Sequence, residues 1–301
     1  MSMSMASTGA PMMNATRHAS FLAFVVISSL AFYKTLSTLV KHSLHDQSSS
    51  HIILIPFVAF FLLYIKRQTV FLITKTNIGS GLGLALGGII LYWLANRAPF
   101  PKAGNWLLSL ETFSVILVWV GGFLLCYGLG ALRAGAFPLL FLLLMVPLPG
   151  VVLDRAIQAL QEGSTEIAYL IFQVVGTPVA RQGFVLSVPG VTIEVAKECS
   201  SIRSSIALFV TCLLAAHLYL RTGWKMLLFV LLSFPLSVVK NGIRIATLTL
   251  LSIYVDPSFL TGNLHRDGGF VFFVLALLML WPVFSWLAKS EKPRRYVNSA
   301  T

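Results

Sequence analysis

The chain has little charge, few acidic residues and few cysteines. Charged residues make up 11% of its 301 residues, well below the roughly 25% of soluble domains, so the composition argues against a soluble globular fold. The three cysteines, Cys126, Cys199 and Cys212, cannot form a disulfide framework and lack the spacing of a zinc site. We expect residues 1–19 to be a weakly basic leader rather than a cleavable secretory signal.

Apolar residues are abundant instead, at 57% of the chain. They gather in runs long enough to cross a bilayer, which takes about 20 residues per helix. Backbone polar groups in lipid must be paired within the segment, so these runs predict helices. We therefore predict an all-α polytopic membrane protein, forming one integral membrane domain over 1–301. Its expected spans, about eight, are 20–40, 51–65, 77–95, 107–131, 136–153, 201–220, 225–250 and 268–288.

The net charge of +12 would suggest a nucleic-acid partner in a soluble protein. Here we assign the excess to cytoplasmic loops, with membrane lipids as partners and no nucleic acid, because Lys and Arg accumulate on the inner side of membrane proteins. Both termini are then cytoplasmic, and the basic tail 289–301 anchors at the anionic leaflet. It follows that the loop 154–199, the start of the sixth span and the end of the seventh face outward.

The outward loop 154–199 has two patterns of its own. Its first part, DRAIQALQEGSTEIAYLIFQVVG, alternates polar and apolar residues at helical spacing and predicts an amphipathic helix on the membrane surface. Its second part, FVLSVPGVTIEV, alternates with period two on either side of Pro189-Gly190, which predicts a β-hairpin. In that hairpin the apolar positions lie opposite one another: Phe184, Leu186 and Val188 on one strand, and Val191, Ile193 and Val195 on the other.

A polar cluster, KECSSIRSS, opens the sixth span. It places Cys199 at the outer N-terminus of a helix, where the dipole favours an anion, and Arg203 one turn further on favours thiolate over thiol. We therefore predict a reactive cysteine, with Ser200 beside it. The alternative is a small residue that merely begins a helix. Cys126 and Cys212 lie within apolar runs, which is typical of packing.

The seventh span carries charge in SVVKNGIRI, where Lys240 and Arg244 share a helical face and Asn241 precedes Arg244 by one turn. A charge at membrane depth costs at least about 2.5 kcal/mol, so such residues are functional candidates; the alternative is that they extend to the outer surface. His265, in the outer loop before the last span, could also be merely solvated. A thiolate, an arginine and a histidine together are the groups needed for acyl transfer.

Two weaker patterns point to packing or surface positions. His42, His45 and His51 cluster near the first outer loop, but their spacing matches no strong metal site, so we expect neither a metal nor another cofactor. In GSGLGLALGG, Gly79, Gly83 and Gly87 recur every four residues. This predicts close helix packing by these three glycines rather than a nucleotide loop.

The order of these segments resembles that of the exosortases, membrane transpeptidases of the exosortase/archaeosortase family. VTIEVAKECSSIRSS is similar to their cysteine motif, KNGIRI to their arginine motif, FPLLFLLLMVPLPG to their fifth-span segment and DQSSSHIILIP to a weaker signature. The resemblance implies Cys199 as nucleophile, Arg244 as oxyanion stabiliser and His265 as general acid/base, with Arg203, Asn241 and Ser200 in support. The family usually has Cys-Ser-Gly where this chain has Ser201, which we expect to fit the helix's first turn.

The resemblance further implies a bacterial inner-membrane enzyme with its active site facing the periplasm. Its protein partners would be exported proteins whose C-terminal tails carry a short motif such as Pro-Glu-Pro, one span and a basic cluster. Cleavage near the motif through a thioester would precede transfer to an acceptor, in a surface or exopolysaccharide export pathway. Two other interpretations stay open: a transporter of an anionic solute along Lys240, Arg244 and Arg203, and a non-catalytic assembly factor.

Overall fold

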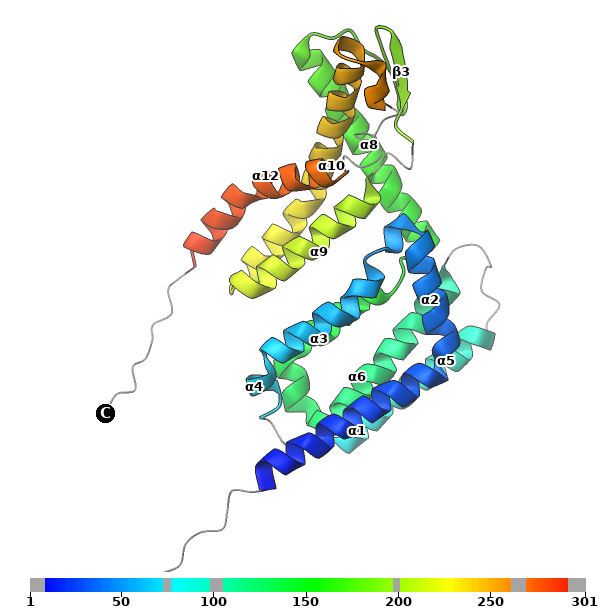
Figure 1. Ribbon diagram of the computed structural model, residues 1–301, viewed down its shortest axis with the longest axis vertical. Coiled ribbons are helices and arrows are strands. Elements are labelled where there is room, and N and C mark those ends of the chain that lie inside the picture. Colours follow the sequence, from blue (N-terminus) through cyan, green and yellow to red (C-terminus); the bar gives the residue numbers. More distant parts are fainter. Residues whose placement is uncertain (1–8, 73–76, 98–104, 197–200, 261–268, 292–301) are drawn as a thin grey trace, which may run out of the picture. The chain divides into compact units, whose positions relative to one another are not determined.

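The computed structural model describes residues 9–72, 77–97, 105–196, 201–260 and 269–291. The chain forms two compact units, Met1–Leu153 and Asp154–Thr301, and each is described by itself. Helices dominate both units (Figure 1). This confirms the predicted fold class of an all-helical polytopic membrane protein with one small sheet.

The first unit is built around a pair of long helices, α5 (Ile78–Arg97) and α6 (Trp106–Ala134), which pack against each other along their length. The remaining elements of this unit are α1 (Gly9–Ala31), α2 (Tyr33–His45), α3 (Ile55–Ile65), α4 (Arg67–Val70) and α7 (Ala136–Phe141), with 3₁₀ turns η1 (Gln47–Ser49), η2 (Ile52–Leu54) and η3 (Leu142–Met145).

Small residues hold α5 against α6, but they are not the ones predicted. A Cβ added at Gly79, Gly83 or Gly87 would meet nothing within 4 Å. At Gly88, on another face of the same helix, a Cβ would lie 2.8 Å from the Ser114 carbonyl oxygen. Gly81 and Ala85 complete this buried face, and Gly121 of α6 approaches Ala85 closely. The expected mode of packing therefore occurs, on a different face of α5.

The second unit contains nearly all of α8 (Gly150–Val175), whose first four residues belong to the first unit. Three strands follow: β1 (Ala180–Gln182), β2 (Val185–Val188) and β3 (Val191–Glu194). The chain then forms α9 (Ile202–Tyr219), α10 (Gly223–Tyr254), the 3₁₀ turn η5 (Pro257–Leu260) and α12 (Gly269–Lys289). Helix α10 contacts both α9 and α12.

The predicted hairpin is confirmed as β2–β3, with Leu186 paired with Ile193 and Val188 with Val191. Strand β1 pairs antiparallel with β2 and extends the hairpin to three strands. The apolar side of the sheet packs against α8 and α10, in a core of Ala168, Phe172, Leu186, Val188, Val195, Ile245 and Ala246. The sheet is therefore anchored to the same stretch of α10 that carries Arg244.

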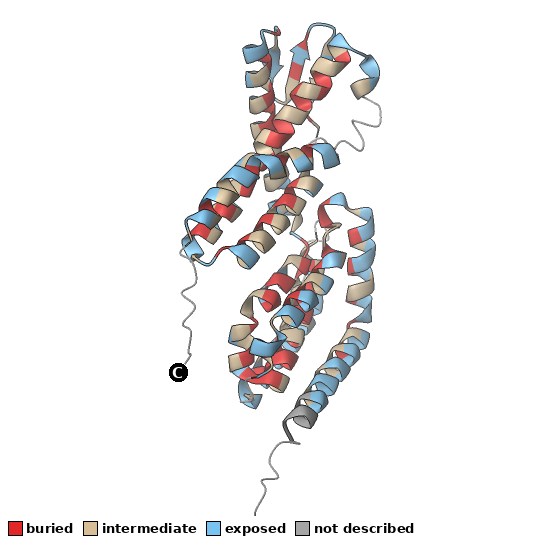
Figure 2. Ribbon diagram, turned by 60° about the vertical axis from the view of Figure 1, so that its left-hand side comes forward, coloured by how far each residue is buried: buried red, intermediate tan, exposed pale blue. Residues whose placement is uncertain are grey.

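Within the described residues, six helices are long and apolar enough to cross a membrane, or up to eight if two interrupted helix pairs each count as one span. Much of their surface is exposed, as lipid-facing helices require (Figure 2). The expected span 20–40 is not continuous: it breaks at Phe32, where α1 and α2 meet at 79°. The expected span 136–153 is also interrupted, because helical structure stops at Met145 and resumes at Gly150, around Pro147 and Pro149.

The carboxylate of Glu291, just after α12, binds the turn between α9 and α10. Glu291 accepts hydrogen bonds from the backbone N–H groups of Arg221 and Thr222, 3.3 and 3.2 Å, and from the Thr222 hydroxyl, 3.1 Å. Partial burial raises the pKa of Glu291, but these bonds and nearby Lys225 outweigh it, so the pKa lies below its usual value. The end of α12 is thereby tied to the α9–α10 turn.

Candidate active site

Ser201 is the N-cap residue of α9. Its backbone is in the left-handed region, with φ of 53° and ψ of 31°. Among the described residues, Ser201 is the one non-glycine residue with positive φ. The expectation that Ser201 lies within the first helical turn is therefore wrong: it precedes the turn, in a conformation that glycine adopts freely. This explains why glycine is usual there in the family that the motif resembles.

The Ser201 hydroxyl connects α9 to α10. It accepts a hydrogen bond from Nη1 of Arg244 at 2.7 Å and donates one to Oδ1 of Asn241 at 2.7 Å. The Asn241 amide in turn donates from Nδ2 to the Ser164 hydroxyl of α8 at 3.0 Å. Asn241 and Ser164 are fully buried, and Ser201 is 9% exposed. Three helices thus meet in one buried chain of hydrogen bonds that ends on the Arg244 guanidinium.

Glycines allow α8 and α10 to approach closely enough for this chain. A Cβ at Gly242 would lie 2.4 Å from Cγ2 of Ile167, and one at Gly163 would lie 2.6 Å from Cγ1 of Val238. Any larger side chain at these positions would push the helices apart. Gly242, inside the KNGIR stretch, therefore brings Asn241 within reach of Ser164.

The same helix α8 holds the end of the sheet. Nε2 of Gln161, 6% exposed, donates to the Val195 carbonyl oxygen at 2.8 Å. Val195 itself is 1% exposed and bonds through its N–H to the Phe184 carbonyl at 3.0 Å. The chain is thereby fixed on both sides of 197–200, at Val195 and at Ser201.

Lys240 lies one turn before Arg244 and is 1% exposed. Its Nζ donates a hydrogen bond to the Ser204 hydroxyl of α9, and Ser204 in turn donates to the Ser201 carbonyl at 3.0 Å. A buried ammonium is costly unless it is hydrogen-bonded, so this contact accounts for how the lysine is tolerated. The lysine does not extend to the surface.

The structure brings together some of the predicted site residues. Arg244 and Asn241 meet at the start of α9, as the expected shared outer end of the two spans requires. Arg203 is exposed and makes no hydrogen bond or ion pair with other described residues. Cys199, Ser200 and His265 lie outside the described residues. The roles of Ser164 and Ser204 were not predicted; Ser204 belongs to the polar run after Cys199, but Ser164 gave no signal that set it apart.

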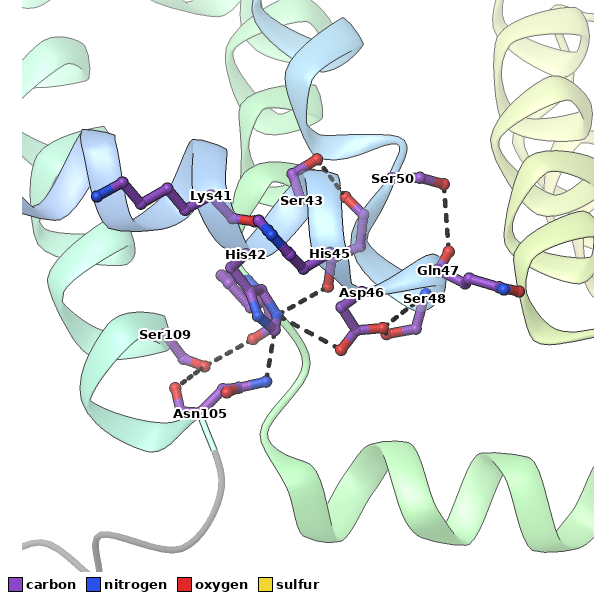
Figure 3. Close-up of polar contacts among 12 residues, drawn as sticks. Lys41, His42, Ser43, His45, Asp46, Gln47, Ser48, Ser50, Asn105 and Ser109 are labelled. Carbon is purple, nitrogen blue, oxygen red and sulfur yellow. Dashed lines mark hydrogen bonds and ion pairs between the residues drawn. The ribbon is translucent and has the colours of Figure 1, made fainter. Parts of the chain in front are cut away.

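A second polar cluster, in the first unit, surrounds His42 (Figure 3). Its Nε2 lies 3.0 Å from the Ser49 hydroxyl, 3.3 Å from Nδ2 of Asn105 and 3.7 Å from Oδ2 of Asp46. A Ser-His-Asp triad needs the serine and the carboxylate on opposite ring nitrogens. Here both are near the same nitrogen, so the cluster connects α2, η1 and the start of α6 rather than forming a nucleophile.

The other two histidines near that loop have separate partners. Nδ1 of His45 bonds to the Lys41 carbonyl oxygen at 2.7 Å, and the half-buried His51 side chain bonds to the backbone of Ser48 and Leu144. No group of three metal-ligating side chains occurs within the described parts of the chain. The three histidines thus hold local structure.

Together, the apolar spans and the Ser201–Asn241–Arg244 junction define a multi-pass membrane protein with polar groups concentrated between the start of α9 and the facing part of α10. The family model described as transmembrane exosortase (Exosortase_EpsH) matches residues 43–282. The chain therefore belongs to the transmembrane exosortase family. Neither the curated proteins nor the solved structures gave a match.

Proposed function

We propose that this exosortase is a cysteine transpeptidase that cleaves C-terminal sorting tails of exported proteins and transfers them to an acceptor. The single observation that carries the proposal is the hydrogen bond between Arg244 and Ser201. Because Ser201 follows Cys199 by two residues, covalent geometry limits their Cα–Cα distance to about 7 Å. The guanidinium is therefore held beside the segment that contains the proposed nucleophile.

In the proposed reaction the Cys199 thiolate attacks the scissile amide carbonyl, forming a C–S bond and a tetrahedral oxyanion. Arg244 donates hydrogen bonds to that oxyanion as its charge develops. The C–N bond then breaks, and His265 supplies the proton that leaves with the amine. The acceptor then attacks the thioester and gives up its proton to His265, which breaks the C–S bond and regenerates both the Cys199 thiolate and the protonated histidine, so no oxidant or cofactor is needed.

The proposed substrates are exported proteins with a short motif, a single span and a basic cluster at the C-terminus. The proposed location is the bacterial inner membrane, with the start of α9 facing the periplasm and the acceptor in a surface or exopolysaccharide pathway. The basic residues support this orientation, since Arg221 and Lys225 lie at the far end of α9 and α10 from Ser201 and Arg244.

The test is co-expression of the full chain with a reporter whose tail carries Pro-Glu-Pro, one span and a basic cluster. We expect processing by the wild type and none by Cys199→Ala. Hydroxylamine should cleave a thioester acyl-enzyme of the wild type only, releasing the reporter as a hydroxamate and the free Cys199 thiol. Cys126→Ala is the matched control, because Cys126 lies within α6, and should process normally. Processing that survives in Cys199→Ala would exclude a cysteine nucleophile.

The transporter interpretation uses the same basic residues and predicts a different pattern. A transporter that moves an anionic solute along Lys240 and Arg244 would tolerate loss of the thiol and fail on loss of either cation. A non-catalytic assembly factor would give no tail processing in any variant. Activity lost in Cys199→Ala but retained in Cys126→Ala would exclude both.

A further inference from the structure

Ser201 has a backbone conformation that a serine adopts at a disadvantage. At a φ of 53°, the Cβ of an L-residue crowds the backbone, whereas glycine has no Cβ and accepts this region freely. Asn and Asp are the next most tolerant residues, and serine is less so. A serine in this position therefore calls for a compensating role of its hydroxyl.

Helix capping is not that role. A capping serine accepts a hydrogen bond from the backbone N–H two or three residues into the helix, and Ser201 makes no such side-chain cap. Its backbone carbonyl begins the helix instead, by accepting from the Ser205 N–H at 3.0 Å. The hydroxyl is turned away from α9 and toward α10.

On α10 the hydroxyl uses its donor and one of its acceptor sites for two different partners. Its proton goes to Oδ1 of Asn241, so that a lone pair faces Nη1 of Arg244. Asn241 cannot easily rotate to change this arrangement, because its Nδ2 is bonded to the buried Ser164 hydroxyl. Side chains of α8 and α10 thus set the orientation of the Ser201 hydroxyl, and the hydroxyl in turn orients the Arg244 guanidinium through their hydrogen bond.

We propose that Ser201 is a positioning residue that fixes the Arg244 guanidinium for the reaction, with Asn241 and Ser164 orienting its hydroxyl. This rests on the proposed function and adds a residue to which the resemblance assigns no role. Ser201 acts through Arg244 and does not itself touch the substrate. Replacing Ser201 should therefore change the rate of the reaction independently of the stability of the protein.

Two substitutions make the separation measurable in the full chain. Ser201→Gly removes the hydroxyl and relieves the backbone, whereas Ser201→Ala removes the hydroxyl and keeps the unfavourable φ. We expect the melting temperature of the purified protein to be unchanged or higher for Ser201→Gly and lower for Ser201→Ala. Both should lower kcat for the tail reporter by about tenfold with KM within about a factor of two, the pattern of a lost transition-state contact.

A double-mutant cycle with Arg244→Lys then tests the route of the effect. If Ser201 acts through the guanidinium, adding Ser201→Gly to Arg244→Lys costs little further activity, because coupled residues are not additive. Ser164→Ala should produce a smaller loss of kcat in the same direction. The matched control is Ser187→Gly on the exposed position of β2, which should process the reporter at the wild-type rate.

These experiments test the cysteine mechanism and the positioning role of Ser201 separately. Processing by Cys199→Ala would overturn the proposed function, whatever the Ser201 variants do. If Cys199→Ala is inactive, three results would each overturn the positioning role alone: wild-type kcat in Ser201→Gly, full additivity with Arg244→Lys, or a parallel fall of melting temperature and rate in Ser201→Gly.

Discussion

At the scale of single residues, Lys240 and Arg244 of α10 bind different partners, and Lys240 is buried whereas Arg244 is half-buried. Lys240 gives a hydrogen bond to Ser204, whereas Arg244 directs Nη1 to Ser201. A guanidinium has five N–H donors in a fixed plane, and an ammonium is a compact charge on a flexible stem. In the proposed reaction, this plane would let Arg244 keep its bond to Ser201 while another donor faces the substrate carbonyl.

Arg244→Lys should therefore impair the enzyme strongly even though the charge is kept. We expect kcat/KM for the tail reporter to fall at least about 100-fold, the cost of losing an oxyanion donor. The measurement is the steady-state rate in detergent-solubilised protein, and Arg155→Lys, at an exposed position of α8, should retain wild-type activity. A loss below about threefold would exclude Arg244 from transition-state stabilisation.

Residue chemistry made part of this site predictable. Lys240, Asn241 and Arg244 stand out in the sequence because polar side chains are expensive inside an apolar span. Ser164 does not, since serine is ordinary in an amphipathic helix, and its contact with Asn241 depends on the close approach at Gly242. Such contacts arise from tertiary packing, which local composition does not encode.

At the scale of elements, patterns that act over a few residues predicted well. The β2–β3 hairpin was predictable because its alternation and its Pro-Gly turn are adjacent in sequence. The face by which α5 packs was not, because two faces of that helix carry small residues. The choice between them depends on α6, where Gly121 accepts Ala85. The break at Phe32 likewise has neither proline nor glycine to signal it.

The packing of α5 on α6 gives a matched pair of neighbouring glycines. Gly88→Ala places a methyl group 2.8 Å from the Ser114 carbonyl and should destabilise the protein by about 1–3 kcal/mol through overpacking. Gly87→Ala meets no atom within 4 Å and should change the stability by no more than about 0.5 kcal/mol. Thermal unfolding in one detergent compares the two, and equal shifts would contradict the packing of Gly88 on α6.

At the scale of the whole molecule, the distribution of basic residues predicts which end of the second unit faces the cytoplasm. Helix α9 has 18 residues and spans about 27 Å from Ser201 to the turn that holds Arg221. The sheet and Arg244 lie at the Ser201 end, since Ile245 and Ala246 pack against β2. The positive-inside tendency therefore predicts that Arg221 lies in the cytoplasm and the sheet outside.

Thiol labelling of two exposed positions tests this orientation. In a background with the three native cysteines replaced by alanine, Ser187→Cys on β2 should react with a membrane-impermeant maleimide in intact spheroplasts. Arg221→Cys should react only after the membrane is permeabilised. The reverse pattern would place the sheet in the cytoplasm and would contradict a periplasmic site.

The length of α10 has a consequence for how an anchored polypeptide is cut. Arg244 follows Lys225 by 19 residues, about 28 Å along the axis, and the hydrocarbon layer is about 30 Å thick. With Lys225 at one headgroup layer, the guanidinium reaches the opposite one rather than the bilayer centre. Scission would then occur where an exported chain emerges into water, and its severed anchor would stay behind in the lipid.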